Sequence, residues 1–168
     1  KSPAQLFNRD KMRLTSRFIS AVKSFIHIGY QATDKEKYDN YSNEARQYIF
    51  KNGFLMIDNK AVADYSKFRI SRGEIAPPED YSMETTNINS NPDQGEKKVA
   101  TIRWKTPQQG DLKLNPVDKV MICMFSNIGE YGLEWLNSNV AERKDGSLII
   151  PVPKSDEVIH FWMFFNNT

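Results

Sequence analysis

The sequence is short of the residues on which most recognisable functional sites are built. Its 168 residues include one cysteine, Cys123, and two histidines, His27 and His160. A single cysteine cannot form an intramolecular disulfide, and these three residues do not make a zinc site. We therefore expect no metal, no cofactor and no disulfide-stapled scaffold.

Long apolar runs and a strong charge of one sign are missing as well. No stretch approaches the roughly 18 to 20 apolar residues that span a membrane, and the net charge is only +2. Nucleic-acid-binding domains show a stronger basic balance on one face, so nucleic acid is not expected as a partner. With 39% hydrophobic residues the chain is nevertheless globular. These features leave the cellular compartment open.

The first third of the chain predicts a two-helix hairpin over residues 1–57. The first helix begins with a capping box at residues 2–5 and is expected to end at Gly29. A second capping box at residues 33–36 predicts a second helix, which Asn52-Gly53 closes. The apolar stripe of the first helix consists of Leu14, Phe18, Val22 and Phe25.

From residue 64 onwards, short extended runs alternate with turn residues. The expected strands are 65–71, 83–89, 98–105, 119–125, 131–136, 139–144, 147–152 and 158–165. Asp145-Gly146 between two of them is the strongest hairpin signal. The runs 119–125 and 158–165 are apolar on both faces, so we expect them to be covered neighbours at the centre of one sheet.

Together these patterns predict an α+β fold. The two-helix N-terminal hairpin, 1–57, is expected to pack on an antiparallel immunoglobulin-like β-sandwich, 64–168, as one cooperative unit. The first residue is Lys1 and not Met, so we also expect an upstream segment to have been removed.

Several short motifs give the chain a resemblance to an uncharacterised bacterial family, a domain of unknown function. They are Gln5, Arg9, Met12, Phe18-Ile19, Phe25-Ile26, Gly29-Tyr30, residues 64–67, residues 70–73, Asp118-Lys119 and His160. The resemblance extends over nearly the whole chain and implies a helical segment followed by a sandwich. Members usually carry a glycine-rich segment before this helix and a further strand after the last one, so we expect a trimmed chain. The family implies no activity, cofactor or catalytic residue.

Arg9, Arg13 and Arg17 are spaced by four residues and form a basic stripe on the first helix. Such a row suits phosphate groups or an acidic protein surface. The alternative is an ordinary solvated helix face. We favour that alternative, because three arginines without aromatic platforms contribute little affinity for single-stranded nucleic acid.

Aromatic residues supply a second candidate binding surface. Tyr131 and Trp135 lie on one face of an expected strand and form a flat surface suited to a sugar ring or a partner protein. The alternative, which we favour, is that Trp135 belongs to the sandwich core, as we expect for Trp104 and Trp162.

Reactive side chains are few and lack an arrangement that predicts catalysis. Cys123 and His160 lie on the two doubly apolar runs, but no third orienting group stands at a recognisable spacing. We expect a buried thiol and a packed histidine. Asp118 and Glu130 flank an expected strand, and two carboxylates among 21 acidic residues do not by themselves indicate a cleft.

The sequence therefore predicts a non-catalytic structural or protein-interaction module, a subunit of an assembly formed with a protein partner or by self-association. The alternative is a carbohydrate-binding module that uses the exposed aromatic strand face. If the terminal strand leaves a sheet edge unpaired, we expect another chain to complete that edge.

Overall fold

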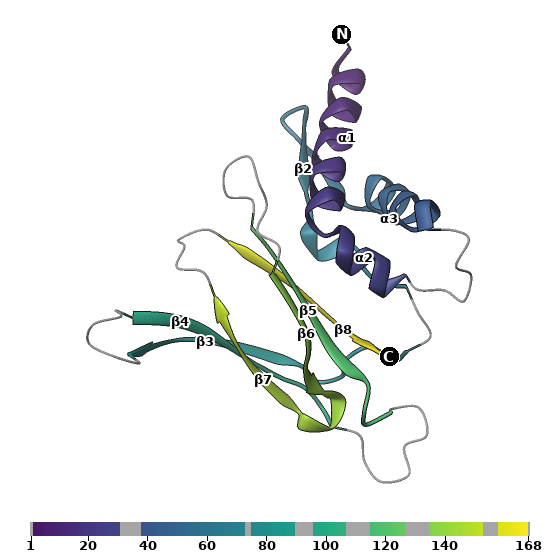
Figure 1. The fold of residues 1–168 in the computed structure, drawn as a ribbon. Helices are drawn as coiled ribbons and strands as arrows, with labels where there is room; N and C mark the ends of the chain where they lie inside the picture. The colour runs from purple at the N-terminus through teal and green to yellow at the C-terminus, as the bar shows by residue number, and fades with distance from the viewer. Residues whose placement is uncertain are drawn as a thin grey trace. The chain divides into compact units, whose positions relative to one another are not determined.

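The computed structural model describes residues 2–30, 38–72, 75–89, 96–106, 115–126, 135–152 and 158–167. Within these ranges the chain forms three α-helices and eight strands in three sheets (Figure 1). The fold is therefore α+β, as predicted.

The chain divides into two compact units. Unit 1 comprises residues 1–74, 123–136 and 159–162, and unit 2 comprises residues 75–122, 137–158 and 163–168. Strands β5 (Lys119–Ser126), β6 (Trp135–Glu142) and β8 (Ile159–Asn166) contribute residues to both units. The cooperative folding of 1–57 with 64–168 stays a prediction.

Helix α1 (Pro3–Ala21) begins as the sequence predicts. The Gln5 backbone donates to the Ser2 side chain, and the Ser2 backbone donates to the Gln5 side chain. The expectation of one continuous helix to Gly29 was wrong, because Val22 leaves helical geometry with φ of −110° and separates α1 from α2 (Lys23–Gly29). The apolar stripe continues through the break, since Phe18, Val22 and Phe25 are all buried.

Glycine closes α2 for a reason other than a left-handed cap. A Cβ atom at Gly29 would lie 2.5 Å from the Ile70 carbonyl oxygen, and the Arg72 backbone donates to the Gly29 carbonyl over 2.7 Å. Only a glycine lets these two backbones approach so closely. Helix α3 (Tyr38–Asn52) ends where predicted, while the capping box expected at 33–36 lies outside the described residues.

An aromatic cluster forms the core of unit 1. The Phe18 ring lies 4.8 Å from Phe68, 5.1 Å from Phe125 and 5.3 Å from Trp162, between ring centroids. The Trp162 indole also donates to the Phe68 carbonyl over 3.0 Å. Trp162 packs among core residues, as predicted. Its side chain is only half-buried, however, and not fully buried as expected of a core residue.

The strand predicted at 65–71 was wrong. Tyr65–Lys67 form a 3₁₀ turn, η2, because the Ser66 hydroxyl donates to the Asp64 carboxylate over 2.5 Å and the Lys67 backbone donates to the Asp64 carbonyl. Such local side-chain bonds compete with extended pairing.

A short antiparallel hairpin precedes that turn and was not predicted. It consists of β1 (Phe54–Ile57) and β2 (Lys60–Ala63), with Leu55 opposite Val62. Asp58 and Asn59 between them have positive φ values of 49° and 60°, which suits a two-residue hairpin turn. Strand β2 contacts α1 (Figure 1).

The sheet of unit 2 has the order β3-β4-β7 and is antiparallel (Figure 1). Its strands are β3 (Ser82–Asn89), β4 (Glu96–Arg103) and β7 (Ser147–Val152). One face is apolar and buried through Ala100, Ile102, Ile150 and Val152. All three strands fall close to their predicted positions.

The third sheet has the order β6-β5-β8, so the prediction that 119–125 and 158–165 are neighbours is confirmed. β5 is central and buried from Val120 onwards, but β8 lies at the end of the order and is only half-buried over residues 159–163. The expectation of two central, doubly covered strands was therefore wrong for β8. Two separate strands were expected at 131–136 and 139–144, but Trp135–Glu142 form one continuous strand, β6; the rest of the first expected strand, 131–134, lies outside the described residues.

The Asp145-Gly146 signal marks a turn, but not a hairpin between paired strands. β6 and β7 belong to different sheets, and a 3₁₀ turn, η3 (Arg143–Asp145), lies between them. The Glu142 backbone donates to the Asp145 carboxylate over 2.7 Å, and Gly146 then takes the left-handed conformation with φ of 68°. The turn itself was predicted correctly, but the expected pairing of the two strands on either side of it was wrong.

Candidate functional site

The predicted arginine stripe is present on α1. Arg9 and Arg13 are exposed, whereas Arg17 is half-buried. Burial raises the pKa of Tyr65, and the positive charge of Arg17 acts against that rise. Arg17 therefore belongs partly to the core of unit 1, while Arg9 and Arg13 present their charge to solvent.

The predicted aromatic binding surface cannot be placed. Tyr131 lies outside the described residues, and Trp135 opens β6 with a side chain that is also outside them. The carbohydrate-binding alternative stays a prediction.

His160 lies in the aromatic cluster of unit 1. Its ring centroid is 4.2 Å from that of Tyr65 and 6.2 Å from that of Trp162, and burial lowers its pKa. Cys123 in β5 is fully buried, as expected of an unreactive thiol. These surroundings suit packing residues.

Asp118 is part of a buried ion pair in unit 2. Its carboxylate lies 3.2 Å from the Arg143 Nε atom, and the two residues are only 4% and 1% exposed. The Arg143 guanidinium also donates to the Ala76 carbonyl over 2.8 Å and lies 3.6 Å from the Phe165 ring centroid. Trp104, buried as predicted, donates its indole hydrogen to the Arg143 carbonyl. All of these groups have partners, so the cluster serves as a structural centre; Glu130 lies outside the described residues.

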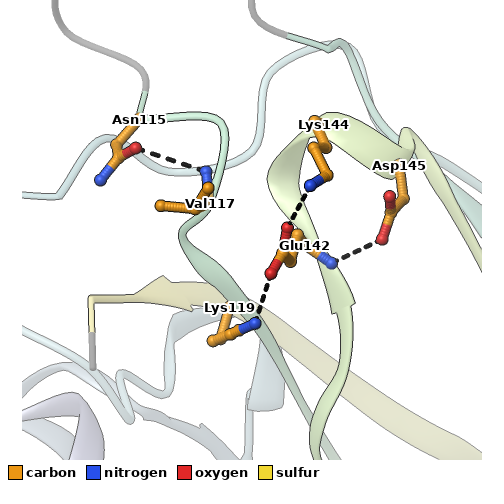
Figure 2. A network of polar contacts seen from close by, with 6 residues as sticks. All are labelled: Asn115, Val117, Lys119, Glu142, Lys144 and Asp145. Atoms are coloured by element: carbon orange, nitrogen blue, oxygen red, sulfur yellow. Dashed lines mark hydrogen bonds and ion pairs between the residues drawn. The ribbon is translucent and has the colours of Figure 1, made fainter.

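Figure 2 shows a second polar network, which involves Lys119 and Glu142, the neighbours of Asp118 and Arg143 in the chain. The Glu142 carboxylate accepts hydrogen bonds from Lys119 and from Lys144, the latter over 2.7 Å. These two ammonium groups lower the pKa of Glu142 to about 2. The Asn115 side chain accepts a hydrogen bond from the Val117 backbone just before β5 begins. The carboxylate therefore stays ionised at neutral pH and holds the start of β5 to the end of β6.

The described part of the chain contains neither a metal-binding group nor a membrane-spanning helix. There, no group of three or more His, Cys, Asp or Glu side chains comes together as a metal site would require. Likewise, none of the helices in that part has the length and apolar character needed to cross a membrane.

One face of the β1–β2 hairpin, which we call the hairpin face, exposes three large apolar side chains: Leu55, Ile57 and Val62. These side chains are 46%, 49% and 41% exposed, although all three are large and apolar. Side chains alternate along a strand, and Leu55 is paired with Val62, so the three share one side. Lys60, opposite Ile57, adds a positive charge there. Contiguous exposed apolar groups of this kind mark interaction surfaces.

Sequence reasoning missed the hairpin face because residues 54–57 form an apolar run too short to classify. The signal that was available is Asp58-Asn59, since these residue types tolerate left-handed backbone. Their exposure could not be foreseen, because an apolar strand is ordinarily buried.

The model of a family of unknown function, DUF6266, matches residues 1–166. No curated protein and no solved structure matches the chain.

Proposed function

The chain belongs to the DUF6266 family, whose function is unknown, and we propose that it is a non-catalytic protein-interaction module within a larger assembly. The observation that carries the proposal is the hairpin face. Three adjacent large apolar side chains stand out from a two-stranded sheet that has no described third strand. A partner that covers them removes apolar surface from water.

The gain from covering this face is large enough to matter. Full burial of such a side chain contributes about 1.5–3 kcal/mol, so covering the exposed half of three of them contributes roughly 2–4 kcal/mol. An association constant changes tenfold for about 1.4 kcal/mol. The hairpin face is therefore a substantial part of an interface, and polar contacts around it supply the rest.

The positive charge of the first part of the chain supports a partner surface that is acidic around its apolar centre. Residues 1–74 hold 14 Lys or Arg and eight Asp or Glu, a net charge of +6, whereas residues 75–168 hold nine and 13, a net charge of −4. Arg9, Arg13 and Lys60 are exposed members of the basic part. Complementary charge speeds encounter and excludes wrong partners. The proposed partner surface is apolar at its centre and acidic around it.

A triple substitution tests the proposal: Leu55→Ser, Ile57→Thr and Val62→Thr. The matched control changes three apolar residues of unit 2 that are at least as exposed as Val62, Ile88→Thr, Val117→Thr and Ile149→Thr. In extracts of the organism that produces the protein, we expect wild type and control to elute with a larger complex on gel filtration. The hairpin variant should leave that complex while keeping its stability within about 0.5 kcal/mol. A hairpin variant that stays in the complex would contradict the proposal.

Two finer features belong to the same proposal: an immunoglobulin-like arrangement of the strand-rich part and a bacterial origin. Both are implied by the family resemblance. The antiparallel β3-β4-β7 sheet and the second sheet of three strands support the first of them. An experimental structure of the whole chain would test the arrangement.

A further inference from the structure

The outer half of the β1–β2 hairpin is exposed on both of its faces. Leu55 and Ile57 lie on the hairpin face, whereas Met56 lies on the opposite face, because side chains alternate along a strand. Met56 is 58% exposed, more than any residue of the hairpin face. Residues 55–60 are all exposed, while Phe54 at the base is half-buried. Apolar side chains are therefore open to water on two opposite sides of the same short hairpin.

The base of the hairpin is fixed to the rest of unit 1. The Phe54 ring lies 5.8 Å from that of Phe68, between ring centroids, and the Asp64 backbone donates to the Gly53 carbonyl over 2.9 Å. The Lys11 ammonium of α1 lies 5.7 Å from the Phe54 ring centroid, a cation–π contact between helix and strand. The hairpin is thus held at one end, and a partner does not have to order its base on binding.

We propose that the hairpin enters a groove of the partner protein, whose two walls cover both of its faces; this inference rests on the proposed function. A flat partner surface would cover the hairpin face and leave Met56 in water. A groove removes the apolar side chains of both faces from water, so its walls are apolar. The turn consists of Asp58 and Asn59 and is followed by Lys60, so the floor of the groove is polar.

The polar turn also favours a protein groove over a lipid surface. A hairpin that dips into a bilayer enters with its turn first, and Asp58 and Lys60 would then carry two charges into the apolar region at a high cost. A protein groove can instead offer a hydrogen-bond donor to the Asp58 carboxylate and a carboxylate to the Lys60 ammonium. The partner is therefore a protein with an apolar-walled groove.

Oxidation of methionine by hydrogen peroxide tests the groove on the unaltered protein. Peroxide converts an accessible thioether to the sulfoxide, and mass spectrometry gives the rate at each methionine. In the larger complex that wild type forms in extracts, we expect Met56 to be oxidised several-fold more slowly than in the free protein. Met83, which is 44% exposed in β3 of unit 2, should be oxidised at the same rate in both.

The variant Met56→Gln measures the contribution of the second face to binding. Glutamine keeps the length of the side chain but replaces its apolar end by an amide. Covering the exposed part of a methionine corresponds to roughly a four- to twentyfold change in affinity. The complex should therefore dissociate at a correspondingly higher concentration on gel filtration. The matched variant Met83→Gln should leave that concentration unchanged.

The outcomes separate the groove from the proposed function. If Met56 is oxidised as fast in the complex as in the free protein, or if Met56→Gln binds like wild type while the triple hairpin variant leaves the complex, the partner surface is flat and only the groove is overturned. If wild type forms no complex, or if the triple variant stays in it, both proposals fail. Sedimentation of the wild type with vesicles of anionic phospholipid, lost in Met56→Gln, would overturn the groove in favour of a lipid surface.

Discussion

Replacing Arg143 by methionine should destabilise the protein strongly. Methionine keeps much of the side-chain volume but removes the guanidinium that faces Asp118, the Ala76 carbonyl and the Phe165 ring. Asp118 is 4% exposed and would then be a buried carboxylate without its cation. The variant therefore isolates the cost of an uncompensated buried charge.

The expected magnitude follows from the burial of both partners. Removing one member of a buried ion pair costs about 3–5 kcal/mol, because the remaining charge cannot recover its hydration. For a chain of this size one kcal/mol corresponds to about 2–4 °C in melting temperature, so the midpoint should fall by roughly 6–20 °C. The loss should appear in the urea midpoint as well, with little change in slope.

The decisive control is the double variant Arg143→Met with Asp118→Leu. Replacing a whole buried ion pair by apolar residues is often neutral or stabilising. We therefore expect the double variant to be more stable than Arg143→Met alone, measured by urea unfolding followed through tryptophan fluorescence. If the two changes simply add, or if Arg143→Met costs less than about 1 kcal/mol, the ion pair is not a structural centre of unit 2.

Three further predictions concern local features. The pKa of Glu142 is about 2 in the folded protein, against an ordinary value of 4.5. Its contribution to the free energy of unfolding is therefore complete above pH 4.5 and is lost as the pH falls towards 2. Glu142→Gln should remove this pH dependence from a curve of stability against pH. Gly29→Ala should cost about 1–3 kcal/mol, because its Cβ meets the Ile70 carbonyl, and an unchanged melting temperature would contradict that geometry. Ser2→Ala removes the cap of α1 and should cost about 1 kcal/mol in urea unfolding, whereas Ser2→Asp should cost almost nothing.

Features set by neighbouring residues could be predicted from the sequence. The capping box at Ser2 depends only on the next three residues, and the end of α3 at Asn52 on a local stop signal. β5 could be identified as buried on both faces, because its odd-numbered and its even-numbered residues are both apolar. Only a strand covered on both sides of the sheet hides both sets of side chains.

Features that depend on distant partners could not be predicted. β8 has the same doubly apolar pattern as β5, yet it stands at the end of the described order β6-β5-β8, since the pattern indicates burial of the two faces and says nothing about which strands pair. Asp145-Gly146 has ideal turn chemistry, but the strands it joins belong to different sheets. Arg143 stands in a polar turn and would be expected at the surface, and its burial results from Asp118 and Phe165 far away in the chain.

Of the candidate surfaces, too, one could be predicted from neighbouring residues and the other could not. The exposure of Arg9 and Arg13 follows from their positions opposite the apolar stripe of α1, which the helical period already determines. The exposed hairpin face has no such signal. Leu55, Ile57 and Val62 are ordinary core residue types, and only the folded structure shows that nothing described covers their outer side.

The aromatic cluster around Phe18 also determines when α1 can complete its packing during protein synthesis. Two of its ring partners, Phe125 and Trp162, follow more than 100 residues later in the chain. At about 5–20 residues per second, a ribosome needs roughly 7 to 30 seconds to reach Trp162 after it has made Phe18. Throughout that interval the newly made first helix must wait with its aromatic side incomplete. Nascent chains stopped before β8 should accordingly remain sensitive to protease in α1, and resistance should appear only when the last strand has left the exit tunnel.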